Sequence, residues 1–159
     1  MISIIIPVYN DPKGLDDTLG SLVEQHYSKE DYEIIVADNG STDNTVQVAQ
    51  EYVRDWPNLV RIVIEDKIQS SYAARNRGIE AARGEIISFV DADMTVGTDW
   101  LGKVAAAFVE HDPDYLGCNV HIYSKRHSVV SLYDIVTGFK IRGFMENAHY
   151  APTCCLTVK

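Results

Sequence analysis

Two spacings of apolar residues alternate along the first two thirds of the chain. Short β-branched runs, each closed by a polar or turn-forming cluster, are typical of buried strands. Between these runs, apolar residues recur every three or four positions, as in amphipathic helices. The runs predict strands at 2–10 (stopped by Pro7), 32–38, 59–65 and 85–91. The helical spacing predicts helices at 11–27, 46–53, 70–84 and 98–111. The second of these helices closes before Pro57, and the third ends at Gly84.

This alternation of strand and helix, with short connections, predicts the fold class. It indicates an α/β protein of Rossmann-like type, a three-layer α/β/α sandwich whose mostly parallel central sheet has helices on both faces. After residue 112 the pattern changes to a strand at 115–124, a helix at 128–147 weakened by Gly138 and Gly143, and a strand at 151–158. The helix is expected to pack on the core, although an acceptor-side or membrane-facing role stays open. We expect one domain over 1–159, truncated at its C-terminal end because an apolar strand runs up to Lys159.

Charge and composition narrow the range of partners. The chain has 14 Lys and Arg against 23 Asp and Glu, a formal net charge of −9, which argues against broad nucleic-acid binding. A phosphate-bearing ligand would therefore need local cations or a metal. Cys118, Cys154 and Cys155 form no C-x-x-C pair and read as reduced thiols, so we expect a cytoplasmic protein. No run approaches the ~20 apolar residues of a membrane span, although peripheral contact with the inner membrane face stays open.

Polar residues follow all four predicted strands of the first part, at 8–11, 38–43, 65–67 and 91–93. Open parallel sheets bind ligands at the carboxyl ends of their strands, so four such clusters together predict a ligand site. Each cluster alone is also typical of a solvated loop or cap. Asp38 could form an Asx turn, and Ser41 or Thr42 could cap the helix that follows.

Asp91 and Asp93 are the strongest candidates for chemistry. If the chain stays extended through Ala92, both carboxylates point the same way and repel, which predicts a divalent cation or a shared proton between them. Oxygen ligands with open positions suit Mg²⁺ or Mn²⁺ that also binds phosphate oxygens. The same letters, D-x-D-x-T-V, begin haloacid-dehalogenase-like phosphatases, in which Asp91 would be the nucleophile. That class needs Asp91 on the first strand, whereas three strand–helix units precede it here.

Arg75 and Arg77 lie in the first turns of the predicted helix at 70–84. Their spacing directs them to different sides, and a helix N-terminus does not favour cations, so one of them is expected to bind phosphate. We favour Arg75 and expect Arg77 to be exposed. His111, His121, His127 and His149 lack metal-ligand spacing, and no P-loop, dinucleotide-binding or nucleophile-elbow motif occurs.

Three stretches in matching order and spacing, SIIIPVYND, IIVADNGSTDNT and AARNRGIEAARGEIISFVDADM, resemble the family-two glycosyltransferases with the GT-A fold over residues 1–112. The resemblance implies an enzyme that transfers a sugar, with inversion, from a nucleoside-diphosphate sugar such as a UDP-sugar. It implies Mn²⁺ or Mg²⁺ as cofactor and an unknown acceptor (glycan, lipid-linked or protein). Polysaccharide or cell-wall glycan biosynthesis is the implied setting.

The resemblance also assigns roles to individual residues. The nucleoside pocket would be lined by Pro7, Val8, Tyr9 and Asn10. Asp38 would hold the base, and Gly40 and Ser41 would allow the loop to approach it. Arg75 would contact the donor, Asp91 would approach the ribose or sugar, and Asp93 would bind the metal.

Two departures from the family pattern affect these expectations. The glycine usual before the A-R-N letters is absent, so the donor loop is expected to differ. The family's general base lies beyond the strand at 151–158, and neither Asp134 nor Glu146 matches it, so no base is assigned. The 151–155 segment also lacks the family's Gly-Ala-Asn run. A donor-binding fragment or non-catalytic module therefore stays open, whereas PVYNDPKG is not the glycine-rich, arginine-containing loop of a sugar nucleotidyltransferase.

Overall fold

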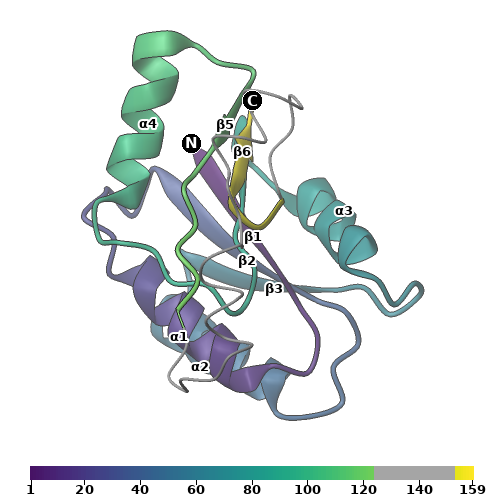
Figure 1. Cartoon of the computed structure of the whole chain (residues 1–159). Helices are drawn as coiled ribbons and strands as arrows, with labels where there is room; N and C mark the ends of the chain where they lie inside the picture. Colours follow the sequence, from purple (N-terminus) through teal and green to yellow (C-terminus); the bar gives the residue numbers. More distant parts are fainter. Residues whose placement is uncertain (124–152) are drawn as a thin grey trace.

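The computed structural model describes residues 1–123 and 153–159, which form one sheet covered by helices (Figure 1). The elements in chain order are β1 (Ile2–Val8), α1 (Pro12–Val23), β2 (Tyr32–Asp38), α2 (Thr45–Asp55), β3 (Val60–Ile64), α3 (Ser71–Ala81), β4 (Ile86–Phe89), α4 (Trp100–His111), β5 (Tyr115–Gly117), a 3-10 turn at Thr153–Cys155 and β6 (Leu156–Val158).

The sheet has the strand order β3-β2-β1-β4-β6-β5. The pairs β1–β2, β2–β3 and β1–β4 are parallel, and β6 runs antiparallel to both β4 and β5. The predicted class, a mostly parallel sheet with helices on both faces, is confirmed. Because the first four strands are parallel, their carboxyl ends meet at one edge, as the clusters of polar residues require.

Alternation along the strands separates two apolar layers. Ile4, Ile6 and Val8 of β1 belong to the larger core with residues of α1, α2 and α4. Ile5 belongs to a smaller core on the other face, with Ala74 of α3. Figure 1 shows α3 on the opposite side of the sheet from α1 and α2.

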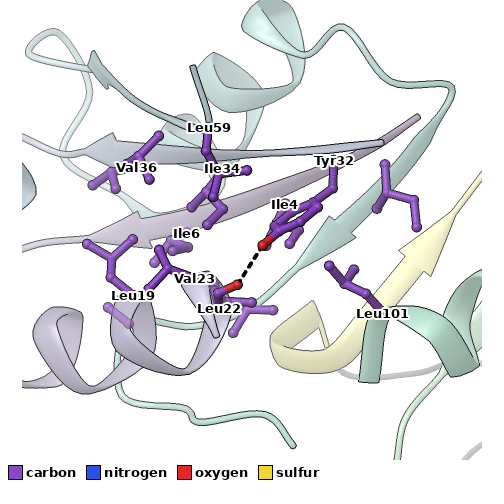
Figure 2. Close-up of a cluster of buried hydrophobic side chains, with 14 of the residues drawn as sticks. Ile4, Ile6, Leu19, Leu22, Val23, Tyr32, Ile34, Val36, Leu59 and Leu101 are labelled. Carbon is purple, nitrogen blue, oxygen red and sulfur yellow. Dashed lines mark hydrogen bonds between the residues drawn. The ribbon is translucent and has the colours of Figure 1, made fainter. Parts of the chain in front are cut away.

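The larger core also contains the Tyr32 hydroxyl, which has a defined partner. Tyr32, 2% exposed, lies among Ile4, Leu22 and Leu101 (Figure 2), and its hydroxyl donates to the Leu22 carbonyl over 3.0 Å. Burial raises the pKa of Tyr32 to about 12. The hydroxyl therefore stays protonated and fastens the C-terminal end of α1 to β2.

The predicted C-terminal end of the third helix is wrong. The helix predicted to run to Gly84 ends at Ala81, since the Arg61 guanidinium donates to the Ala81 carbonyl and Glu33 accepts the N–H of Arg83. Gly84 does not end the helix but lies against the start of β1, where a Cβ would be 2.8 Å from the Ser3 nitrogen and 2.6 Å from the preceding Met1 carbonyl.

The C-terminal predictions are confirmed in part. β5 covers only the start of the strand predicted at 115–124, and the strand predicted at 151–158 begins with the 3-10 turn before β6. The helix predicted at 128–147, with Gly138 and Gly143, lies outside the described residues. Within the described ranges, no helix is both long and apolar enough to span a membrane.

A polar cluster, which we call the Glu33 cluster (Ser3, Glu33, Arg61, Arg83 and Gly84), lies near the amino ends of the strands. Glu33 Oε1 accepts from the Ser3 hydroxyl at 2.6 Å and from the Arg83 N–H at 2.7 Å, and Oε2 accepts from Arg61 Nε at 3.0 Å. The Ser3 hydroxyl accepts in turn from the Gly84 N–H at 2.8 Å. Both carboxylate oxygens of this buried acid are therefore satisfied.

Candidate functional site

The loops after β1 and β2 are joined at the carboxyl edge of the sheet. The Asn10 N–H donates to the Ser41 hydroxyl at 3.0 Å, and Asn10 Oδ1 accepts from the Thr42 N–H at 2.8 Å. Asn10 and Gly40 both have positive φ, 50° and 75°, a conformation that asparagine and glycine tolerate better than other residues. The sequence allowed Ser41 or Thr42 to cap the helix that follows, but neither caps it. The N-cap of α2 is Asn44, while Asp43 accepts from the Thr45 N–H and the two candidates join the loops.

Asp38, the last residue of β2, is 2% exposed and has an incomplete set of partners. Its Oδ2 accepts from the N–H groups of Gly40 and Ser41, both at 3.0 Å. Its Oδ1 is buried and has no hydrogen-bond partner among the described residues. Such an atom is costly unless a ligand supplies a donor. The Asx-type turn therefore uses one carboxylate oxygen and leaves the other without a partner among the described residues.

Asn39, next in the chain, fastens the loop that leads from β3 into α3. Its amide nitrogen donates to the carbonyls of Glu65 and Ile68, at 3.0 and 2.8 Å. Glu65 Oε1 accepts from the N–H groups of Lys67 and Ile68, both at 2.9 Å, and these bonds hold the pKa of Glu65 below its usual value. The 65–70 segment is therefore ordered against the Asp38 turn.

Arg75 of α3 and Asp91, two residues after the end of β4, form an ion pair at the carboxyl edge of the sheet. Arg75 Nη2 lies 2.6 Å from Asp91 Oδ1, with the side chains 14% and 34% exposed. Arg75 Nε is buried and lacks a partner within the described ranges. Arg77 instead pairs with Glu80 on the exposed side of α3. The structure thus brings Arg75, and not Arg77, to the edge.

The segment Asp91–Ala92–Asp93 is not extended, which corrects the assumption behind two parallel carboxylates. A turn forms in which the Met94 N–H donates to the Asp91 carbonyl at 3.1 Å. Asp91 faces Arg75, Ala92 is buried, and Asp93 is exposed. The physical reason is that Thr18 of α1 draws the Ala92 carbonyl inward with a hydrogen bond of 2.8 Å. The two carboxylates are therefore not aligned by an extended strand.

The predicted nucleoside-pocket residues divide by exposure. Pro7 and Val8 are buried within β1, Val8 in the larger core, and the Val8 carbonyl already accepts from the Asn39 N–H. Tyr9 is 47% exposed and Asn10 is exposed as well. Pairing of β1 with β4 ends at Ile5, so Pro7 lies beyond that ladder, where its missing N–H is tolerated.

A cavity of about 870 Å³ opens beside the turn at 91–94. One wall is formed by Asp91, Asp93 and the residues up to Gly97, and the other by Trp100, Cys118, His121 and Tyr123. The Trp100 indole N–H donates to Cys118 Sγ at 3.4 Å, while burial raises the pKa of that thiol against this hydrogen bond. Sequence reasoning missed this second wall, because 115–124 was predicted as a regular strand. The early end of β5 at Gly117 releases 118–123 to line the cavity.

The donor set for a metal is sparse. No group of three or more His, Cys, Asp or Glu side chains that could hold an ion occurs in the part of the chain that the structure describes. Asp93 is exposed, and Asp91 is paired with Arg75 while a third of its side chain is accessible. One or two carboxylates with open positions fit Mg²⁺ or Mn²⁺ that takes its other ligands from phosphate and water.

Comparison with known proteins gives consistent matches. A sequence model of the family described as Glycosyl transferase family 2 matches residues 3–155. The glycosyltransferase AglE of Haloferax volcanii is 35% identical over 159 residues, which cover 99% of this chain and 52% of AglE. The chain thus spans about half the length of that relative, and it spans only 16% of a poly(ribitol-phosphate) beta-glucosyltransferase of Bacillus spizizenii that is 44% identical over 102 residues.

Solved structures agree in fold. TarS 1–349 of S. aureus, in complex with UDP-GlcNAc, matches with a TM-score of 0.68 and 30% identity, over 80% of this chain and 36% of that chain. A mannosyltransferase of Pyrobaculum calidifontis matches with a TM-score of 0.77 over 99% of this chain and 44% of that chain, at 22% identity. The architecture described above is that of the GT-A glycosyltransferases.

Proposed function

The chain belongs to glycosyltransferase family 2, and on that premise we propose that the carboxyl edge of its sheet binds a nucleoside-diphosphate sugar for transfer of the sugar to an acceptor hydroxyl. A UDP-sugar is the favoured donor, because TarS, 30% identical to this chain, was solved with UDP-GlcNAc. The haloacid-dehalogenase-like alternative is dropped, since β1, β2 and β3 all precede Asp91.

One observation carries the proposal: Asp38 Oδ1 is buried and has no hydrogen-bond partner within residues 1–123 and 153–159. Uracil has an N–H at N3 that could donate to this atom, and cytosine has a lone pair there instead. Gly40 and Ser41 hold the carboxylate through its other oxygen, so Oδ1 is kept free and oriented. The exposed Tyr9 follows β1 and the ordered 65–70 segment follows β3, on either side of the loop after β2, and the two would enclose the nucleoside.

The diphosphate would lie toward Arg75, Asp91 and the cavity. Arg75 Nε is a buried donor that has no partner in the described part of the chain, so a phosphate oxygen could satisfy it beside the Asp91 carboxylate. Mg²⁺ or Mn²⁺, held by Asp93 and Asp91, would supply positive charge that stabilises the leaving diphosphate. The acceptor hydroxyl attacks the anomeric carbon opposite that diphosphate, with inversion, and a general base removes its proton.

Asp134 and Glu146 lie outside the described residues, and we assign neither as the general base. Cell-wall or other glycan synthesis fits relatives such as the poly(ribitol-phosphate) beta-glucosyltransferase. We also infer a cytoplasmic site of action, because the proposed donor is a nucleotide sugar, with contact at the inner membrane face left open.

Titration calorimetry of UDP in the presence of Mn²⁺, on wild type and Asp38→Asn, tests the proposal. In the variant the amide oxygen can keep the hydrogen bonds from Gly40 and Ser41. The amide nitrogen then faces the uracil N–H, so two donors oppose each other. We expect UDP affinity to fall about a hundredfold or more, and CDP, whose N3 accepts, to gain relative to UDP. Asp31→Asn, the same change at an exposed site before β2, should leave both affinities unchanged. Absence of UDP binding by wild type, or unchanged binding by Asp38→Asn, would refute the proposal.

A further inference from the structure

A polar stripe runs along α1 beside its apolar one. Gly14, Thr18, Ser21 and, just beyond the end of the helix, Gln25 follow each other at spacings of four, three and four residues. Such spacing places them along one side of a helix. The neighbouring residues Leu15, Leu19 and Leu22 fill the larger core.

Each polar side chain of this stripe binds the backbone of the segment 92–101, which leads from β4 into the first turn of α4. Thr18 Oγ1 donates to the Ala92 carbonyl at 2.8 Å, and Ser21 Oγ accepts from the Val96 N–H at 3.2 Å. Gln25 uses both ends of its amide. Its Nε2 donates to the Gly97 carbonyl at 2.8 Å, and its Oε1 accepts from the Leu101 N–H at 3.0 Å.

Gly14 begins the stripe with a close backbone approach. A Cβ at this position would lie 2.7 Å from the Ala92 carbonyl oxygen, as well as against the Asp11 side chain that caps α1. Any larger residue would push the turn at 91–94 away from the helix. Helix and turn therefore fit together without room for displacement.

The stripe is placed where polar groups are unfavourable. Thr18 is 0% and Gln25 is 3% exposed, and buried polar groups destabilise unless they are hydrogen-bonded. An apolar residue at position 18 would pack as well without that requirement. The hydroxyl is thus used to hold Ala92, while the other side of the same segment, from Asp91 to Gly97, forms a wall of the cavity.

We propose that Thr18, Ser21 and Gln25 are positioning residues that hold Asp91 and Asp93 in place for the diphosphate and metal of the donor. They act through the backbone of 92–101 and do not touch the ligand. The inference rests on the proposed function, because it assigns these contacts to the donor site.

Thr18→Val and Thr18→Ser separate positioning from packing. Valine keeps the shape and removes the hydroxyl, whereas serine keeps the hydroxyl. With Mn²⁺ present, we expect UDP affinity to fall about tenfold in Thr18→Val and to return nearly to wild type in Thr18→Ser. Uridine, which has no phosphate, should bind all three proteins equally, because the Asp38 turn is untouched. Equal loss of uridine and UDP, or no loss of UDP, overturns the inference.

Amide hydrogen exchange gives a readout that does not depend on any ligand. The Val96 and Leu101 amides should exchange faster in Ser21→Ala and Gln25→Ala respectively, and the Met94 amide should do so in Thr18→Val. Ser28→Ala, a matched change at an exposed site, should alter none of them. If wild type binds neither UDP nor uridine, the proposed function fails and the donor role fails with it. Unchanged exchange in all three variants shows that α1 does not hold the segment.

Discussion

The two ends of β2 carry two buried acids that differ in how fully they are bonded. Glu33 near the amino end has partners on both oxygens, from Ser3, Arg61 and the Arg83 N–H. Asp38 at the carboxyl end, five residues later, has partners on one oxygen only among the described residues. Arg75 of α3, whose Nε also lacks a partner within the described ranges, lies at the same carboxyl edge of the sheet.

This difference separates a structural polar cluster from the proposed donor site. A buried network with all its partners adds rigidity and stability, while a buried group that lacks one is stabilised when a ligand supplies it. Proteins tolerate such incomplete bonding where function needs it. Substitutions at the amino end should therefore alter stability, and substitutions at the carboxyl end should alter ligand affinity.

The largest expected effect is on stability, from Glu33→Ala. Removal of the carboxylate leaves the Ser3 hydroxyl, the Arg61 guanidinium and the Arg83 N–H without their acceptor, which should lower the free energy of unfolding by about 3 kcal/mol. Urea denaturation measures this loss. Glu30→Ala, at an exposed position before the same strand, is the control and should change little. A loss in Glu33→Ala no greater than in the control would contradict the structural role of the cluster.

The next effect is on affinity, from Arg75→Met at the carboxyl end. Loss of the guanidinium removes a phosphate donor and leaves Asp91 unpaired, so we expect UDP to bind about tenfold more weakly. Stability should change by less than about 1 kcal/mol, since the pair is partly open to solvent. Arg77→Met removes the exposed pair with Glu80 on the same helix and is the matched control. Equal affinity losses in both variants would show that Arg75 has no special place.

A smaller effect should appear in the pH dependence of stability. Burial tends to raise the pKa of Glu33, but hydrogen bonds from Arg61, Ser3 and the Arg83 backbone outweigh it and hold the pKa below the usual 4.5. A depressed folded-state pKa gives stability that is present above the unfolded-state pKa and is lost as the pH falls through the folded-state value. The gap in unfolding free energy between wild type and Glu33→Gln should therefore narrow from pH 6 toward acid. A gap that stays constant or widens on acidification would mean that Glu33 is not stabilised as a carboxylate.

The last prediction makes the same chemical change at each end, and the smallest expected effect is the one at Asp38. Asp38→Asn should leave the unfolding free energy unchanged within about 0.5 kcal/mol, since the amide keeps both backbone bonds. Glu33→Gln should lower it by about 1–2 kcal/mol, because a carboxamide cannot accept all the bonds that the carboxylate accepts. Urea denaturation at neutral pH measures both. Similar losses in the two variants would remove the distinction between the ends.

Much of the fold follows from patterns that are local in the sequence. The four parallel strands and four helices have apolar periodicities that survive in the structure, so α/β order and the shared carboxyl edge were predictable. The end of α3 was not predictable, because Arg61 and Glu33, distant in sequence, supply the groups that stop it at Ala81. Local preference placed the end at Gly84, whereas the observed role of this glycine is close contact with β1.

The candidate site shows the same division. Asp38, Asn10 and Arg75 could be nominated because each lies at a strand end or early in a helix on the same edge. The turn at Asp91–Met94 could not, because its conformation depends on Thr18, 74 residues away from Ala92. The spacing of Gly14, Thr18, Ser21 and Gln25 was a visible signal for that contact, although nothing local identified its partner.

The antiparallel strand β6 has a consequence for the order in which the chain can fold during synthesis. In the described part of the chain, β5 pairs with β6 alone, and β6 covers the edge of β4, with Ser88 and Thr157 hydroxyls 2.6 Å apart. A ribosome must therefore translate about seventy residues beyond β4 before its edge is paired. Until then the edge of β4 can pair with other chains, so chaperones would matter most during this interval.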